Sequence, residues 1–254
     1  MALGRSGDSM NLTVRVEDIM TPRRQLRHAA SNAEAAKAAE KEDFDAIPLT
    51  RPDGLVREFW SRADERRIRI RQEYRISHDA PVERLLPPLG SHVIQFVYYR
   101  SEMVGLIDAS DLNKPIARIV WLHPMLELER SILDAVRARG ITDDEQATAL
   151  GKQAGSTRGR QAKARRHDLA LPLLEYAQFP DLLRAAHRLG ITQLADEEID
   201  ELNRVRKRAA HSGDAVVEDR NDCARIHRTL EMARKAARSV GHSAGRRLKN
   251  GVPH

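Results

Sequence analysis

An internal repeat in the first half of the chain constrains the fold most strongly. Each copy has two short apolar strands joined by a turn, followed by a segment that ends in an aspartate and is expected to open a helix. These three segments are residues 46–49, 55–60 and 61–64 in the first copy, and residues 92–99, 103–107 and 108–111 in the second. A helix is also predicted to precede each strand pair, over residues 31–42 and from residue 80. Such a repeat indicates two small β-α units.

The periodicity becomes helical from Pro115 onward. Apolar residues then recur at three-and-four spacing, as on one face of a helix: Ile116, Ile119, Val120, Leu122, Leu126, Leu133 and Val136. Gly140 is expected to end this helix, and Thr142 with Glu145 predicts a capping box for the next one. Two further apolar stripes follow, one containing Leu202 and the other Cys223. The expected fold class is therefore α+β, a β-α pair followed by an all-helical bundle.

These patterns predict four segments. Residues 1–13 form a disordered start, residues 14–115 hold the β-α pair, and residues 116–240 form the helical domain. Residues 241–254 are basic and contain glycine, and they are expected to form a disordered tail.

The charge of the chain is unevenly placed. The formal net charge is +6, and residues 1–117 carry as many basic as acidic side chains, so the whole excess lies in residues 118–254. This asymmetry makes the second half a candidate binder of a polyanion such as RNA. The alternative is that arginine is simply spread over solvated faces of the protein.

Composition excludes several classes of protein. The single cysteine, Cys223, rules out an internal disulfide and a cysteine-based zinc cluster. No apolar run approaches the roughly 20 residues of a membrane span, and no secretory signal is visible, so a cytoplasmic protein without membrane contact is expected. Glycine-rich phosphate loops, zinc-protease motifs and nucleophile elbows are absent from the sequence, and no metal site is expected.

The repeated half resembles a tandem CBS-domain pair, the Bateman module that senses nucleotides. Residues 16–22, VEDIMTP, are similar to the usual opening of such domains. Residues 58–64, EFWSRAD, and residues 105–111, GLIDASD, stand where the family has Gly, two apolar residues, Thr, two variable residues and Asp. Two departures are Glu58 in place of the glycine and Asp108 in place of the threonine. The resemblance covers residues 14–115.

The residues of these two copies suggest a nucleotide site. Asp64 or Asp111 at a helix start can accept the hydroxyls of a ribose, and Ser61 beside free backbone N–H groups can hold a phosphate. The resemblance implies an adenine nucleoside or nucleotide (AMP, ADP or ATP) as a regulatory ligand. The alternative is that Ser61 and Asp108 only cap helices, and that the pair serves dimerisation.

The second half resembles a HEPN domain, a helical family with a late Arg-x4-His signature. Residues 205–213, VRKRAAHSG, match that signature at Arg206 and His211, with Lys207 where the family commonly has asparagine. The resemblance implies a homodimer that cleaves RNA without a metal. His211 would take the proton from a ribose 2′-hydroxyl, and Arg206 would stabilise charge on the phosphorane. Further phosphate contacts are expected from three cations: Arg204, Lys207 and Arg208.

Other interpretations of the helical half stay open. Cations in the last turn of a helix are favourable with the helix dipole in any protein. If the cations serve only the helix dipole, the helical half could bind RNA without cleaving it. It could also be a non-catalytic regulatory or scaffold module that binds a partner. DNA binding by a helix-turn-helix ranks lower, because no short helix pair with the right turn stands out in the sequence.

Overall fold

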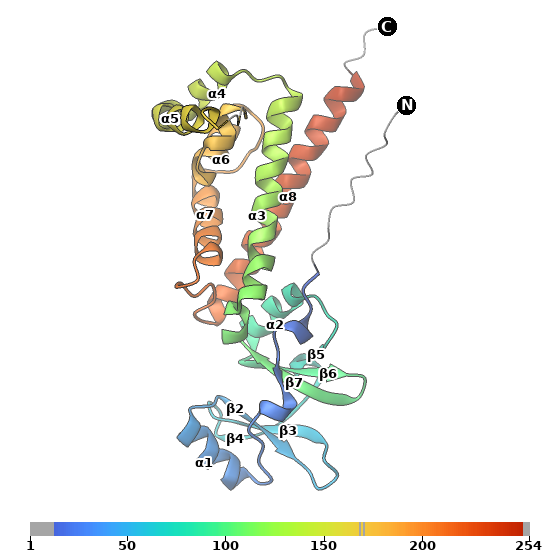
Figure 1. The fold of residues 1–254 in the computed structure, drawn as a ribbon. Coiled ribbons are helices and arrows are strands. Elements are labelled where there is room, and N and C mark those ends of the chain that lie inside the picture. Colours follow the sequence, from blue (N-terminus) through green and yellow to red (C-terminus); the bar gives the residue numbers. More distant parts are fainter. Residues whose placement is uncertain (1–12, 168, 170, 251–254) are drawn as a thin grey trace. The chain divides into compact units, whose positions relative to one another are not determined.

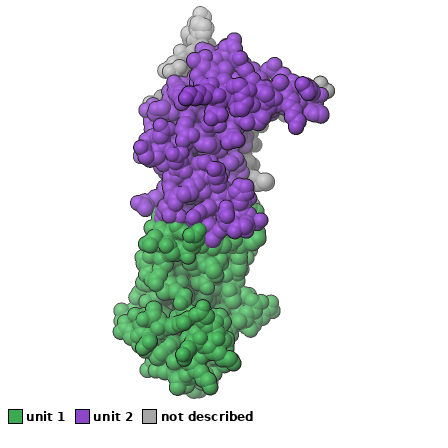
Figure 2. Space-filling model, turned by 90° about the vertical axis from the view of Figure 1, so that its left-hand side faces the viewer, with its two compact units in different colours: residues 1–120, 217–224 green, residues 121–216, 225–254 purple. Residues whose placement is uncertain are grey.

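The computed structural model describes residues 13–250 apart from residues 168 and 170. It divides into two compact units, coloured separately in Figure 2. The β unit comprises residues 1–120 and 217–224 and contains the strands, whereas the helical unit comprises residues 121–216 and 225–254. The α+β class expected from the sequence is confirmed. Most of the expected disordered start, and the last four residues of the expected tail, lie outside the described residues.

Two sheets form the β unit (Figure 1). The four-stranded sheet has the order β1-β7-β6-β5, with β1 at Thr21–Pro22, β7 at Glu102–Asp108, β6 at Ile94–Tyr99 and β5 at Arg75–Ser77. The three-stranded sheet has the order β2-β3-β4, with β2 at Ala46–Thr50, β3 at Val56–Ser61 and β4 at Arg66–Arg69. The second sheet is antiparallel throughout, and in the first only β5 and β6 are parallel.

The structure confirms the internal repeat. In the first copy, helix α1 (Asn32–Glu42) precedes β2 and β3, and in the second, helix α2 (Leu86–Ser91) precedes β6 and β7. The extended segment before each helix pairs in parallel with the strand after it: β5 with β6 in the second copy, and a single bridge from Ala29 to Leu49 in the first. Each copy is thus an extended segment, a helix and a strand hairpin.

The two copies exchange strands at their sheet edges. The short strand β1, which precedes the first copy, pairs with β7 of the second copy. Strand β4, which precedes the second copy, pairs with β3 of the first copy. Each copy therefore completes the sheet of the other, and the two fold as one body.

The prediction that a helix begins at residues 61–64 is wrong. These residues lie in the turn of a hairpin that joins β3 to β4, with Ser61 opposite Arg66 and Glu65 at a φ of 49°. Arg67, Ile68, Arg69 and Ile70 alternate polar and apolar, which is the period of a strand. This alternation places Ile70 in the core, where it is 2% exposed.

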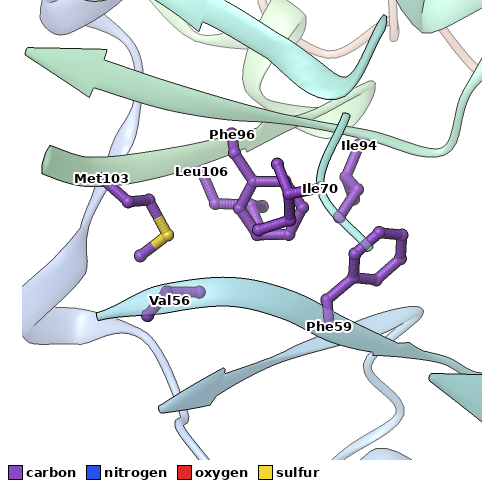
Figure 3. Close-up of a cluster of buried hydrophobic side chains, with 7 residues drawn as sticks. All are labelled: Val56, Phe59, Ile70, Ile94, Phe96, Met103 and Leu106. Carbon is purple, nitrogen blue, oxygen red and sulfur yellow. The ribbon is translucent and has the colours of Figure 1, made fainter. Parts of the chain in front are cut away.

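The core of the β unit lies between the two sheets (Figure 3). Phe59 of β3 and Phe96 of β6 meet there with ring centroids 5.2 Å apart. Both copies contribute side chains to this buried cluster: Val56, Phe59, Ile70, Ile94, Phe96, Met103 and Leu106. Burying a large apolar side chain contributes about 1.5–3 kcal/mol, so a shared core ties the stability of one copy to that of the other.

The helical unit is built from helices of unequal length. Helices α3 and α8 begin in the β unit and continue into the helical unit. In the described part of the chain its α-helices are α3 (Pro115–Ala138), α4 (Asp143–Leu150), α5 (Ala154–Arg165), α6 (Phe179–Arg188), α7 (Asp196–Ala210) and α8 (Arg220–Asn250). The capping box predicted at Thr142 and Glu145 is confirmed, since each side chain accepts from the backbone N–H of the other residue.

The buried face of α3 differs from the predicted stripe. Ile116, Ile119 and Leu126 are exposed by 40%, 50% and 46%. The side chains that are fully buried instead include Trp121, Met125, Leu128 and Ile132. Apolar residues occur around much of this helix, so spacing alone did not determine which face would be covered.

The expected disordered tail is corrected over residues 241–250, because α8 continues to Asn250. One glycine in a helix interior costs only about 1 kcal/mol, so Gly241 need not end the helix. None of the described helices combines the length and apolar character required to cross a membrane.

Candidate functional site

Two of the predicted site residues line a cavity in the β unit. The cavity has a volume of about 260 Å³, and we call it the Ser61 cavity. Its wall comes from the end of β3, the start of β6 and the residues near them: Asp45, Ala46, Phe59, Ser61, Ala63, Asp64, Ile68, Tyr74, Ser91, His92, Val93, Ile94 and Arg220. Arg220 is the first residue of α8, so a distant part of the chain completes the wall.

Ser61 and Asp64 are held together by the β3–β4 turn. The Ser61 hydroxyl is buried and donates to Oδ2 of Asp64 at 2.7 Å, while the backbone N–H of Asp64 donates to Oγ of Ser61 at 3.3 Å. Asp64 itself is exposed to solvent. The turn therefore fixes a carboxylate at the cavity, and a carboxylate oxygen can accept a hydrogen bond from a hydroxyl of a ligand.

Aromatic rings form another part of the wall. The rings of Tyr74 and His92 lie with centroids 4.5 Å apart, and Phe59 contacts Tyr74 at 5.3 Å. Both Tyr74 and His92 are half-buried, so the rings are held by the fold and still reach the cavity. Ring faces of this kind can stack on a nucleobase.

A second cavity shares three lining residues with the first: Asp45, Ala46 and Ile94. It has a volume of about 190 Å³, and we call it the Asp108 cavity. It repeats the first in its construction, since the end of β7 faces the start of β2 as the end of β3 faces the start of β6. Its charged lining is Arg27, Asp43, Asp45 and Asp108, with the exposed ring of Phe44 beside them.

The side chain of Asp108, the last residue of β7, accepts hydrogen bonds from residues that follow it. Its Oδ1 accepts from the backbone N–H groups of Ser110 at 2.7 Å and Asp111 at 3.3 Å, and from the Ser110 hydroxyl at 2.5 Å. These bonds hold the Asp108 side chain against the start of the 3-10 turn Ser110–Asn113. The N-cap position of that turn is Ala109, so the interpretation of Asp108 as an N-cap residue is wrong.

Asp111 lies outside the lining of both cavities. Its carboxylate is 5% exposed, accepts from the Asp108 backbone N–H at 3.1 Å, and pairs with Lys114 Nζ at 2.7 Å. Burial raises the pKa of Asp111, and the Lys114 ammonium opposes that rise. Asp111 is thus used to stabilise the start of the segment that leads into α3.

Arg206 packs inside the helical unit. Its guanidinium lies 5.0 Å from the ring centroid of Phe179, which belongs to α6. Burial raises the pKa of Glu129, and the nearby charge of Arg206 opposes this rise. The contact with Phe179 therefore links α7 to α6. His211 is exposed immediately after α7, where its backbone N–H donates to Lys207 O at 3.0 Å.

The other predicted phosphate contacts differ in their surroundings. Arg204 forms an ion pair with Glu201 on the same helix. Lys207 is exposed, and Arg208 is half-buried. Of these cations, Arg204 is the one with a described carboxylate partner.

Sequence reasoning missed several residues of the Ser61 cavity. Tyr74 lies just before β5, His92 lies between α2 and β6 of the second copy, and Arg220 lies far downstream. No motif connects them, and only the fold brings them to one wall. Among the described residues, no group of three or more His, Cys, Asp or Glu side chains is placed to hold a metal ion.

Two of the solved structures that are similar to this chain illustrate the comparison. An uncharacterized conserved protein from Pyrococcus horikoshii is 20% identical with a TM-score of 0.34, covering 41% of this chain and 92% of its own. A CBS-domain containing protein from Agrobacterium tumefaciens is 16% identical with a TM-score of 0.34, covering 44% of this chain and 98% of its own. No family model matches the chain. No curated protein matches it either.

Proposed function

We propose that the β unit is a CBS-like pair that binds an adenine nucleoside or nucleotide in the Ser61 cavity. One observation carries the proposal. The hydrogen-bonded Ser61–Asp64 pair and the ring pair of Tyr74 and His92 converge on a single cavity of about 260 Å³. This volume is slightly below that of pockets for drug-sized ligands, which start at about 300 Å³, and suits a ligand of nucleoside size.

The chemistry divides between two parts of the wall. The Asp64 carboxylate is an acceptor for ribose hydroxyls, and Ser61 fixes its orientation through the 2.7 Å bond. The rings of Tyr74 and His92 offer faces on which a base can stack. The Asp108 cavity is less suited to a nucleotide, because three carboxylates line it and would repel phosphate.

Isothermal titration with adenosine, AMP, ADP, ATP and S-adenosylmethionine tests the proposal. We expect binding of at least one of them, and a loss of about tenfold or more in affinity in Asp64→Ala, since a hydrogen bond to a charged group contributes about 1.5–3 kcal/mol. Glu102→Ala removes an exposed carboxylate at the β6–β7 turn and serves as the matched control. Absence of heat and of a thermal shift with all five compounds would overturn the proposal.

We also propose that the ligand regulates the helical unit. Helices α3 and α8 each cross from one unit to the other, at residues 120–121 and 224–225, and α3 contains Pro124 just after its crossing. A helix transmits displacement better than a flexible linker does. The partner affinity of the helical unit should then change with bound nucleotide, and nucleotide affinity should change with the partner by the same factor. Equal partner affinity at zero and saturating nucleotide would refute this regulation.

A further inference from the structure

A short helix pair with a tight turn lies in the helical unit. Helix α4 has 8 residues and α5 has 12, and the three residues Gly151–Gln153 join them. Gly151 adopts a φ of 57°, a conformation that strains any residue with a side chain. A helix of this length, a three-residue turn that contains glycine and a second helix are the parts of a helix-turn-helix. The sequence did not reveal this pair, because the turn depends on the backbone conformation of Gly151.

The two helices are packed as a fixed unit. Gln146, Ala147 and Leu150 of α4 are buried, as are Thr157 and Gln161 of α5. The Gln161 amide donates to Asp143 Oδ2 at 3.0 Å, and the Leu174 backbone N–H donates to Gln146 Oε1 at 2.9 Å. Figure 1 shows α4, α5 and α6 gathered at one end of the helical unit. One face of α5 is thereby held against the protein, and the opposite face is presented to solvent.

The solvent face of α5 combines small residues with cations. Gly155, Gly159 and Ala162 are exposed at a spacing of four and three, and a side chain added at either glycine would meet nothing within 4 Å. Three exposed cations flank this ridge: Lys152 in the turn before α5, Lys163 within it and Arg166 immediately after it. These three cations take part in no described ion pair, whereas the other flank is partly neutralised by Arg158–Asp144 and Arg165–Asp143 pairs.

We propose that α4 and α5 form a helix-turn-helix that binds double-stranded DNA, with α5 in the major groove. The major groove of B-form DNA is about 12 Å wide and admits an α-helix. A ridge of glycine and alanine lets the backbone of α5 approach the groove closely, and the flanking cations reach the phosphates on its edge. A-form RNA has a deep, narrow major groove that excludes a helix, so the geometry favours DNA over duplex RNA.

Fluorescence anisotropy with a labelled DNA duplex of mixed sequence and no added nucleotide tests this proposal. We expect binding that weakens steeply between about 50 mM and about 200 mM salt, because each neutralised phosphate releases counterions. The double variant Lys163→Glu, Arg166→Glu should weaken binding about tenfold or more and flatten the salt dependence by about one unit of slope per lost contact.

Two further variants separate a specific surface from net charge. Lys235→Glu, Arg238→Glu makes the same change of charge at exposed positions of α8 and should leave affinity within about twofold. Gly159→Leu leaves the charge unchanged and favours the helix, yet it should weaken binding by filling the ridge. The proposal would be overturned if Gly159→Leu bound DNA with unchanged affinity, or if both double variants lost affinity equally. It would also be overturned if single-stranded or duplex RNA bound more tightly than DNA, or if no DNA bound at low salt. Because nucleotide is absent, none of these outcomes bears on the Ser61 cavity.

Discussion

The two copies of the repeat share one order of elements and differ in how each one ends. After β3, residues 61–65 turn back into strand β4, and this turn holds Asp64 exposed at a cavity. After β7, Ser110–Asn113 form a 3-10 turn that leads toward α3, and Asp111 is buried against Lys114. Two aspartates at equivalent positions therefore have different surroundings, since Asp64 lines a cavity and Asp111 is buried inside the fold.

The two cavities also differ in the charged side chains that line them. The Ser61 cavity has the cation of Arg220 and two carboxylates, whereas the Asp108 cavity has the cation of Arg27 and three carboxylates. The Asp108 side chain is also occupied by the N–H groups of the turn that follows it. The repeated fold thus gives two similar cavities, and the additional carboxylate of the Asp108 cavity is Asp43, which follows α1.

The largest effect is expected from the core that the copies share. Phe59 is 3% exposed and contacts the rings of Tyr74 and Phe96, so Phe59→Ala should cost about 3–5 kcal/mol of stability. Leu55→Ala, in an exposed turn of the same copy, should change stability by less than about 0.5 kcal/mol. Urea unfolding measures the stability of both variants, and hydrogen exchange measures the protection of individual strands. Unchanged protection of β6 and β7 in Phe59→Ala would show that the copies are stable separately.

Thiol reactivity reports how the second copy is covered. A Cβ placed at Gly90 of α2 would lie 3.9 Å from the Cβ of Cys223, so the start of α8 packs on this helix. Burial, followed by the charges of Asp222 and Asp219, raises the Cys223 pKa from 9.0 to about 11. Native protein should therefore react with a disulfide reagent about a hundredfold more slowly than urea-unfolded protein near pH 8, since the thiolate is the nucleophile.

The control for thiol labelling is Cys223→Ser, which should remove the reaction altogether. Equal labelling rates in native and unfolded protein would mean that the start of α8 readily separates from α2. Helix α2 of the second copy would then not be stably covered.

Glycine at the edge of the second copy has a definite structural role. A Cβ at Gly105 would lie 2.7 Å from Met20 Sδ and 2.8 Å from Thr21 O, so Gly105→Ala must displace β1 and should cost about 1–3 kcal/mol. The equivalent Glu58 makes only 3.6 Å ion pairs with two arginines, and Glu58→Ala should cost about 0–1 kcal/mol. Thermal unfolding of the two variants compares them. Similar losses at both positions would contradict the close approach of β1 to β7.

Local patterns predicted the repeat well, because strands 46–50 and 94–99 and their turns are written in neighbouring residues. Strand β4 escaped notice because its short alternation of Arg and Ile is rich in charge, although Ile70 enters the core. The covered face of α3 could not be chosen, since apolar side chains surround much of that helix.

The candidate site was half predicted. Ser61 and Asp64 are close in sequence and were found from the repeat, and the structure joins them by a hydrogen bond. Tyr74, His92 and Arg220 reach the same cavity from separate elements. Their meeting depends on tertiary packing that no local pattern records.

The smallest effect concerns the pH dependence of the buried aspartate. Burial raises the pKa of Asp111 above its ordinary value of 3.8, with Lys114 acting in the opposite direction. A raised folded-state pKa favours the protonated carboxyl, so this contribution to stability is present below the unfolded pKa and is lost as pH rises through the folded pKa. Asp111→Asn, which stays neutral, should therefore gain stability relative to wild type as pH rises across that window.

Urea midpoints of wild type and Asp111→Asn measured through the acid range test this sign. Lys114→Ala removes the ammonium that lies 2.7 Å from the carboxylate, so it should raise the Asp111 pKa further and move the window to higher pH. If the stability difference between Asp111→Asn and wild type instead falls with rising pH, then the Lys114 pair and the Asp108 N–H outweigh burial. Asp111 would then be a carboxylate that the fold stabilises in its charged form. It would differ from Asp64 in being buried, but not in its preferred charge state.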